Sequence, residues 1–347
     1  MPKLRIGCSG FLYDSWRGSF YPETLPQKKC LPFYVKKFNS VELNVTFYRL
    51  LKKEAFERWY KETPPQFSFS LKGSRFITHI KKLKDVDLPL ITFFNTTSPL
   101  MEKLEVVLWQ LPPNFVANMK SLGDFIEAVK VYLERYPVRH AFEFRHKSWL
   151  NKKVFKLLSD SNIAVCMADW PEFIDELPVT ADFVYIRRHG EAGSCSTNYS
   201  TEQLKKDAKR IKDYLSLGKD VYIFFNNDAS GYATKNAMEL RAMLEKSFPM
   251  TARKTKKPVK HAYSPRGPAR TGRHVKPKET PKKKKKDKPV HKNTVKKSKS
   301  KRPAIKRLKT GKISKKHTEK TLGKITKKKI TKKLLKKKPA RKAKGKK

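Results

Sequence analysis

Short strand-like segments recur through the first 250 residues of this 347-residue chain, and helix-like segments separate most of them. The segment HAFEFR is typical, because Phe142 and Phe144 alternate with Glu143 and Arg145. Alternation with a period of two indicates a strand whose two faces have different surroundings. This segment therefore predicts a strand that carries charged residues on one of its faces.

This pattern predicts eight strands, each ending near polar or glycine residues. They are Leu4–Cys8, Ser40–Asn44, Phe67–Lys72, Val106–Gln110, His140–Arg145, Ile163–Asp169, Phe183–Arg187 and Asp220–Asn226. Apolar residues have helical spacing over 122–133 and 204–215. Ser200 and Gln203 form a capping-box pattern before the second of these helices, and Asn151 is a candidate N-cap for a third.

Repeated alternation of strand and helix over about 250 residues is typical of a (β/α)8 TIM-type barrel, an α/β fold. An open, doubly wound sheet is the alternative that the same alternation permits. The segment GCSGFLYDSW at the first strand lacks the third glycine of a dinucleotide-binding loop, which weakens that alternative. We therefore expect one barrel domain over residues 1–250.

In such a barrel, one face of each strand packs on the outer helices, the other points inward, and the chemistry lies at the carboxyl ends of the strands. Phe142 and Phe144 suit the helix-facing side, so Glu143 and Arg145 would point inward. The other predicted strands also end in polar residues: Glu42 with Asn44, Lys72, Gln110, Asp169, Arg187 with His189, and Asn226. Buried charges are costly unless they are paired or used, so we expect these side chains to form one site.

Seven motifs stand in this order along the chain, from about Ile6 to about Leu244: GCSGFLYDSWRGSFYP, FNSVELNVTFYRL, FSFSLKGSRFITH, LWQLPP, AFEFRHKSW, YIRRHG and FFNNDASGYATKNA. They resemble the domain-of-unknown-function 72 family, the YecE-like proteins, whose fold is a TIM-type barrel. The resemblance places the family's polar strand-end positions on the residues named above and adds His79. It implies a fold and a site, but no particular reaction.

The chain departs from the family's pattern at four positions. Cys8 and Phe11 stand where the family implies Thr and Trp, Glu105 stands where it implies Gly, and Arg188 takes a usually apolar place. None of these changes removes a charged residue from the predicted site.

Within that site, Glu143 is our candidate for acid and base catalysis and His189 for a second proton carrier or metal ligand, with Asp169 and Glu42 as further catalytic carboxylates. Side chains that would bind the substrate are Lys72, Arg145, Arg187, Asn44, Gln110, His79 and Asn226. A carboxylate pair could hydrolyse a glycosidic bond, and carboxylates with a histidine could hold a divalent metal cofactor. The equal numbers of cations and carboxylates favour an anionic substrate, phosphorylated or related to nucleic acid, and a hydrolase or isomerase reaction.

These residues also have structural interpretations. Glu143 and Arg145 could be an ion pair that fixes the barrel rim, Asp169 could cap the turn after it, and His79 could lie on a helix face. Cys195 could be a nucleophile, but no neighbour in the sequence marks it as activated.

Residues 251–347 have a different composition. They contain 43 Lys and Arg against 3 Asp and Glu, a net charge of +40, and no Phe or Trp. Such a segment cannot bury enough apolar surface to offset the entropy of ordering, so we expect it to be disordered. Its charge favours DNA, RNA or another polyanion as partner, with little sequence preference and a steep dependence on salt. A solubilising extension without a partner is the alternative.

No apolar segment resembles a signal peptide or a membrane helix, and the four cysteines form no CxxC pair. We therefore expect no membrane partner, reduced thiols, a cytoplasmic location, and association with the nucleoid if the tail binds DNA. Three hypotheses remain: an enzyme tethered by its tail, a module that binds an anionic ligand without turnover, and a nucleoid- or ribosome-associated protein. The mixed charge of the predicted site favours the enzyme.

Overall fold

The computed structural model describes residues 1–133, 136–169, 177–190 and 195–245. All of them lie in the first of two units of the chain, Met1–Tyr263. The predicted tail and its boundary at residue 250 lie outside this part of the chain. Within it, no helix is long and apolar enough to cross a membrane.

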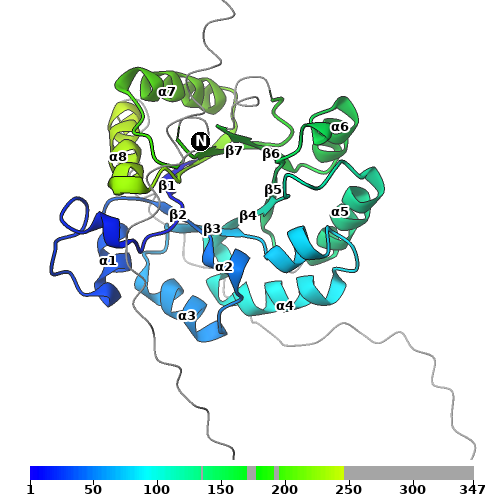
Figure 1. Cartoon of the computed structure of the whole chain (residues 1–347), viewed down its shortest axis with the longest axis horizontal. Helices are drawn as coiled ribbons and strands as arrows, with labels where there is room; N and C mark the ends of the chain where they lie inside the picture. The colour runs from blue at the N-terminus through cyan, green and yellow to red at the C-terminus, as the bar shows by residue number, and fades with distance from the viewer. Residues whose placement is uncertain (134–135, 170–176, 191–194, 246–347) are drawn as a thin grey trace, which may run out of the picture. The chain divides into compact units, whose positions relative to one another are not determined.

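Eight parallel strands form the sheet, in the order β1-β8-β7-β6-β5-β4-β3-β2. They are β1 (Leu4–Cys8), β2 (Ser40–Leu43), β3 (Ser68–Lys72), β4 (Leu104–Gln110), β5 (Arg139–Glu143), β6 (Ala164–Ala168), β7 (Phe183–Arg188) and β8 (Asp220–Phe225). Figure 1 shows the strands as a ring with helices around the outside. The predicted (β/α)8 TIM-type barrel is confirmed, and every predicted strand is present.

Helices connect the strands on the outside of the ring. The α-helices are α1 (Cys30–Tyr34), α2 (Val45–Tyr48), α3 (Lys53–Glu62), α4 (Asp87–Thr97), α5 (Met119–Leu133), α6 (Lys152–Asp160), α7 (Thr201–Ser216) and α8 (Tyr232–Glu245). Shorter turns are η1 (Asp14–Trp16), η2 (Gln27–Lys29), the π-helical η3 (Phe76–Ile80), η4 (Ser98–Lys103), η5 (Lys147–Trp149) and η7 (Ala229–Gly231). Asn151 caps α6, and Ser200 and Gln203 form the predicted capping box of α7.

Side chains join β1 to β2 where the ring closes. The Asn39 carboxamide donates to the Leu4 carbonyl (2.8 Å) and accepts the N–H of Ile6 (3.0 Å). The strands approach closely at Gly7, where a Cβ would lie 2.0 Å from the carbonyl oxygen of Ser40. Glycine is therefore required at position 7 because any side chain would separate the two strands.

The apolar residues form two cores, one on each side of the sheet. On β4, Val107 and Trp109 pack in the larger cluster with the helices, whereas Val106 and Leu108 belong to a smaller cluster. The smaller cluster also contains Ala141, Ala164, Cys166, Ala168, Ala181, Phe183, Tyr185, Tyr222 and Phe224. It comes from the inward faces of the strands, so it fills the barrel interior beneath the polar strand ends.

Charged side chains also gather at the amino ends of the strands. Arg5 contacts Glu105 through Nε (3.1 Å) and Nη2 (2.5 Å), and the Tyr222 hydroxyl donates to the same carboxylate (2.8 Å). Arg139 pairs with Asp220 (2.6 Å). Glu105, a departure from the family's pattern, therefore has partners on two other strands. We call these five residues the amino-end cluster.

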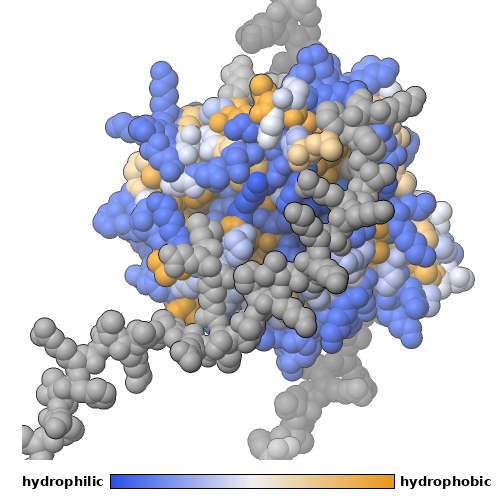
Figure 2. Space-filling model, turned by 180° about the vertical axis from the view of Figure 1, so that it is seen from behind, coloured by the Kyte–Doolittle hydropathy of each residue, from blue (hydrophilic) through white to orange (hydrophobic). Residues whose placement is uncertain are grey.

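The side of the molecule in Figure 2 is mostly hydrophilic where it is coloured, with apolar residues in small separate groups. Surfaces that bind proteins or membranes usually present larger continuous apolar patches. The coloured part of this side therefore gives no indication of such a surface.

Candidate functional site at the carboxyl ends of the strands

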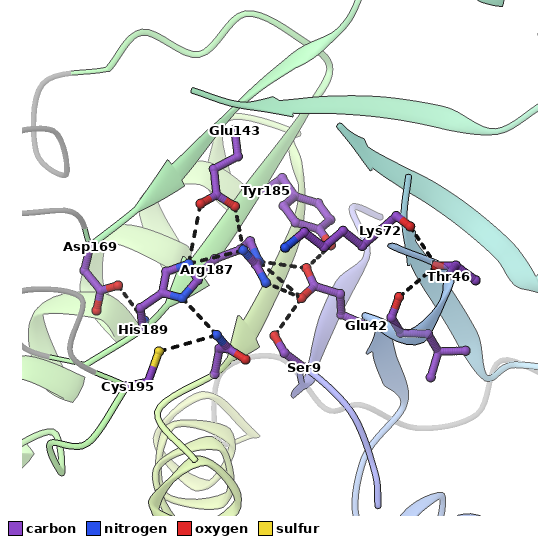
Figure 3. Close-up of polar contacts among 12 residues, drawn as sticks. Ser9, Glu42, Thr46, Lys72, Glu143, Asp169, Tyr185, Arg187, His189 and Cys195 are labelled. Atoms are coloured by element: carbon purple, nitrogen blue, oxygen red, sulfur yellow. Dashed lines mark hydrogen bonds and ion pairs between the residues drawn. The ribbon is translucent and has the colours of Figure 1, made fainter. Parts of the chain in front are cut away.

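Arg187 on β7 lies at the centre of the candidate site and is only 1% exposed. Its guanidinium donates Nη2–H to Glu42 Oε1 (2.8 Å), Nε–H to Glu42 Oε2 (3.0 Å) and Nη1–H to Glu143 Oε2 (2.6 Å). Because β2 and β7 are not neighbours in the sheet, the contact with Glu42 crosses the barrel interior (Figure 3). Arg187 thus joins carboxylates from two other strands.

Glu42 is completely buried and has donors on both oxygens. Besides Arg187, the Ser9 hydroxyl donates to Oε1 (2.6 Å) and the Tyr185 hydroxyl to Oε2 (2.7 Å). Burial alone would raise the pKa of Glu42, but the charge and hydrogen bonds of Arg187, with those of Ser9 and Tyr185, lower it below its ordinary value. Glu42 is therefore held as an anion.

Glu143 on β5 forms ion pairs with both Arg187 and Arg145, so the Glu143–Arg145 pair considered from the sequence is present. Burial alone would raise its pKa, but the charges of Arg187 and then Arg145 hold the pKa of Glu143 well below its usual range. A general acid at neutral pH needs a raised pKa. Neither Glu143 nor Glu42 meets this requirement, so the pair does not suit glycosidic hydrolysis.

His189 lies just beyond the end of β7, beside this network. Its Nε2 faces Nη2 of Arg145 (3.0 Å), Nη1 of Arg187 (3.2 Å) and Oε1 of Glu143 (3.6 Å), and Nδ2 of Asn226 lies 3.0 Å from Nδ1. Burial and then the charge of Arg187 lower the pKa of His189. Since guanidinium groups only donate, they favour a neutral imidazole that accepts at Nε2.

Lys72 ends β3, and its side chain points toward Arg187 (Figure 3). The residue is 8% exposed, and Nζ lies 4.2 Å from the centroid of the Phe47 ring. Within the described part of the chain, Nζ has no hydrogen-bond acceptor and no ion-pair partner. Burial, and then the charge of Arg187, lower the pKa of Lys72 to about 8.

His79 and Asn44 lie on the Lys72 side of the site. His79 is in η3, and its ring packs edge-on against Phe47 at 4.9 Å between centroids. Burial, and then the charge of Lys72, lower the pKa of His79 to about 4, so the ring is neutral. Asn44 directly follows β2, and its buried Oδ1 has no hydrogen-bond partner among the described residues. Two of the predicted substrate-binding residues therefore adjoin Lys72 or its strand.

Asp169 lies on the far side of His189 from Arg187, and its carboxylate is directed to the backbone of His189 (Figure 3). Its Oδ1 accepts the backbone N–H of His189 (2.5 Å), and its Oδ2 accepts the hydroxyl of Tyr199. Burial raises the pKa of Asp169 to about 6. With both oxygens bonded, Asp169 positions His189. The turn after Asp169, residues 170–176, which we considered as the group it caps, lies outside the described residues.

Gln110 and Cys195 stand at the edge of the site. Gln110 ends β4 and is half-buried. Cys195 is half-buried with a φ of 57°, and its Sγ lies 3.7 Å from Nδ2 of Asn226. Because burial raises the pKa of the Cys195 thiol, the structure gives no support to Cys195 as a nucleophile.

Ser9, Tyr185 and Phe47 complete the site but were not selected from the sequence. Tyr185 alternates with Arg187 on β7, so the same two-residue period could have identified it. Ser9 follows the first strand within the GCSG segment. Phe47 lies in the short helix α2, and no pattern of the sequence indicates that it contacts Lys72.

Arg188, another departure from the family's pattern, points to the opposite side of β7. Its Nε donates to Oδ2 of Asp207 on α7 (2.7 Å), and both residues are buried. Asp207 shares the buried face of α7 with Leu204 and Ile211. The positive charge of Arg188 on β7 is therefore neutralised by Asp207 on α7, and Arg188 adds no charge to the candidate site.

The described residues contain no group of three or more His, Cys, Asp and Glu side chains arranged to hold a metal ion. In the candidate site, Glu42 and Glu143 face Arg187 instead. The divalent metal considered from the sequence remains a hypothesis without a ligand set in this part of the chain.

Solved structures resemble this barrel closely. A DUF72 family protein from Thermotoga maritima aligns with a TM-score of 0.62 and 31% identity, covering 70% of this chain and 99% of that one. A DUF72 family protein from Enterococcus faecalis aligns with a TM-score of 0.60 and 18% identity, covering 73% of this chain and all of that one. The second likeness supports the fold alone.

Sequence comparison identifies relatives from the same group. The chain is 24% identical over 258 residues to the UPF0759 protein YunF of Bacillus subtilis, and this alignment covers 65% of this chain and 90% of YunF. It is also 35% identical over 97 residues to the UPF0759 protein YecE of Escherichia coli K12, and this alignment covers 28% of this chain and 36% of YecE. The family model described as "Protein of unknown function DUF72" matches residues 5–261. The chain therefore belongs to the DUF72 family.

Proposed function

We propose that the barrel is an enzyme that binds a small anionic substrate at the carboxyl ends of its strands. The observation that supports this most is Lys72, a buried cation without an anionic partner among the described residues. Two carboxylates of the network accompany three cations, which are Arg145, Arg187 and Lys72. An anionic ligand would supply the missing negative charge, which lowers the cost of burying the ammonium.

The ion network would support the site rather than supply its acid and base. Glu42 and Glu143 have lowered pKa values, so they stay ionised at neutral pH and hold Arg187 in place. Such a preorganised arrangement of charges costs no rearrangement when a ligand binds. We therefore assign the ligand to Lys72 and the neutral His189, with Glu143 as a fixed anion instead of the acid and base that we first considered.

A module that binds the same anion without turnover is the alternative. Binding alone would need only Lys72 and a shape that fits the ligand. His189 adds a neutral imidazole beside the two guanidinium groups, and imidazole is the side chain that most often transfers protons in enzymes. This feature favours the enzyme over the binding module. Conversion of a bound ligand to a product would distinguish the two hypotheses.

Thermal unfolding of the full chain with inorganic phosphate, pyrophosphate or pyruvate tests anion binding. The variants are Lys72→Met, which removes the charge, and Lys72→Arg, which keeps it. Every variant carries the same tail, so anions bound by the tail contribute equally and cancel in the comparison. We expect at least one anion to stabilise the wild type and Lys72→Arg more than Lys72→Met. Equal stabilisation of all three proteins by every anion would contradict the proposal.

The tail supports a second proposal, that it binds DNA, RNA or another polyanion and brings the barrel to it. Its support is the composition of residues 251–347, with 43 Lys and Arg against 3 Asp and Glu. Fluorescence anisotropy with a random-sequence duplex should show affinity that falls steeply, by orders of magnitude between about 50 and 200 mM salt, with little change between sequences. Binding that is insensitive to salt would exclude this mode.

A further inference from the structure

We propose that the Lys72 amine forms an imine with the carbonyl group of its substrate, and that this substrate is a 2-oxo acid or another small carbonyl compound that carries an anion beside the carbonyl. The inference rests on the proposed anion-binding function of the same site. It goes further, because it makes Lys72 a nucleophile as well as a cation.

The position of Lys72 suits a nucleophilic amine. Nζ lies against the face of Phe47 and beside the guanidinium of Arg187 (Figure 3), on a residue that is only 8% exposed. A lysine becomes nucleophilic at neutral pH when it is desolvated or placed next to another cation, because both effects favour the neutral amine. Lys72 meets both conditions: burial and then the charge of Arg187 lower its pKa to about 8, although the charges of Glu143 and Glu42 act in the opposite direction.

A second buried lysine shows what a purely structural ammonium looks like in this protein. Lys103 lies over the ring of Tyr60 at 4.2 Å, the distance that separates Lys72 from Phe47. However, its Nζ donates to the carbonyl oxygens of Tyr60 (2.6 Å) and Thr63 (2.7 Å), and to the Thr63 hydroxyl (3.1 Å). All three protons of Lys103 are used, whereas Lys72 has no such acceptor in the described part of the chain.

The reaction balances without any further reagent. The neutral Lys72 amine attacks the carbonyl carbon, a C–N bond forms, and the π electrons of the carbonyl move to oxygen, which takes up a proton. The nitrogen gives up both of its protons: the first balances the proton taken up by oxygen, and the second leaves with the hydroxyl group as water while the C=N bond forms. The products are one imine and one water molecule. Protonation of the imine restores the positive charge at Nζ.

The substrate class follows from this charge. In a 2-oxo acid the carboxylate is bonded to the carbonyl carbon, which becomes the iminium carbon. The positive charge at Nζ of Lys72 can therefore attract the carboxylate, and the same nitrogen activates the carbon beside it. Asn44 adds a second indication of a ligand. It comes directly after Leu43, the register partner of Leu71, so it lies beside Lys72, and its buried Oδ1 lacks a donor among the described residues. A hydroxyl formed at the attacked carbon would be such a donor.

Reductive trapping tests the proposal on the full chain. The protein is incubated briefly at about pH 7 with pyruvate or glyoxylate and sodium cyanoborohydride, which reduces an imine to a stable secondary amine. Peptide mass spectrometry then measures modification at every lysine. At this pH the neutral fraction of Lys72 exceeds that of an ordinary lysine by roughly two orders of magnitude. We expect Lys72 to be modified at least about 10-fold faster than the exposed lysines, Lys103 not at all, and acetone to react more slowly than pyruvate.

Lys72→Arg separates this inference from the proposed function. It keeps the charge but cannot form an imine, so we expect it to retain stabilisation by anions while trapping at position 72 disappears. Modification of Lys72 no faster than that of the exposed lysines, with anion stabilisation present, would overturn the imine and leave anion binding intact. Absence of both effects would overturn both proposals.

Discussion

The two ends of the barrel bury charges in different ways. In the amino-end cluster, Arg5 pairs with Glu105 and Arg139 pairs with Asp220. At the carboxyl ends, Arg187 pairs with Glu42 and Glu143, but Lys72 adds a cation without a hydrogen-bond acceptor or ion-pair partner among the described residues. In TIM barrels the amino ends generally serve stability and the carboxyl ends serve function. This difference is the basis of our proposal that the paired charges of both ends serve the fold and that Lys72 serves a ligand.

Replacing the central arginine of each cluster should give the largest difference in the free energy of unfolding between the two ends of the barrel. We expect Arg187→Met to lower the free energy of unfolding by about 3–5 kcal/mol, because it leaves Glu42 and Glu143 buried without their main partner. Arg5→Met should cost only about 1–2 kcal/mol, because the side chains of Arg5 and Glu105 are 15% and 13% exposed and water can replace part of the pair. Urea unfolding at neutral pH measures both values.

A control separates loss of charge from loss of volume. Arg187→Lys keeps one positive charge but cannot bond Glu42 through two nitrogens, so its cost should fall between that of Arg187→Met and zero. Equal costs for Arg187→Met and Arg5→Met would show that burial does not distinguish the two clusters.

The two buried lysines should respond with opposite signs. We expect Lys72→Met to raise the free energy of unfolding by about 1–3 kcal/mol, because it removes a buried charge that lacks a partner. Lys103→Met should lower it by about 2–3 kcal/mol, because three acceptors at Tyr60 and Thr63 lose their donor. A lower free energy of unfolding for Lys72→Met would mean that the ammonium stabilises the fold, which would contradict its proposed role.

The gain from Lys72→Met should also depend on pH. The pKa of Lys72 falls from an ordinary 10.5 to about 8 in the folded protein. As the pH falls below 10.5, the unfolded protein takes up a proton on this lysine before the folded protein does, so the folded state loses stability. The loss is complete once the pH has fallen through the folded pKa. The wild type is therefore penalised below about pH 8, and its difference from Lys72→Met should shrink between pH 8 and pH 10.5. Unfolding curves at pH 7 and about pH 9.5 test this, and an unchanged difference would contradict the lowered pKa.

The fold and most of the site were predictable because strand periodicity is a local property. The alternation in HAFEFR placed Glu143 inward and Phe142 outward, as the structure has them. The same period placed Arg187, on β7, and His189, just beyond its end, on one side of the strand. These predictions need only the direction of each side chain from its strand, which neighbouring residues determine.

Pairing across the barrel was not predictable, because it depends on strands far apart in the sequence. Nothing near Glu143 in the sequence shows that Arg187 holds it ionised and makes it a poor acid. The inward direction of Asp169 was also expected from its strand, but the loop after β7 bonds both of its oxygens. Asp207 is different, because its place three residues after Leu204, on the apolar face of a predicted helix, could have indicated a buried partner, but we did not select it from the sequence.

The smallest expected effect concerns the tyrosine that donates to a carboxylate in each cluster. Tyr185→Phe removes the hydroxyl 2.7 Å from Glu42, which is completely buried, so no water replaces it and we expect a loss of about 1.5–2 kcal/mol. Tyr222→Phe removes the hydroxyl 2.8 Å from Glu105, which is 13% exposed, so we expect a loss of about 1 kcal/mol or less. Urea unfolding measures both variants, and the Tyr185 variant should also weaken anion stabilisation if Glu42 orients Arg187 beside Lys72. A larger loss at Tyr222 would show that the amino-end cluster is the less hydrated one, and the contrast between the two ends would then rest on Lys72 alone.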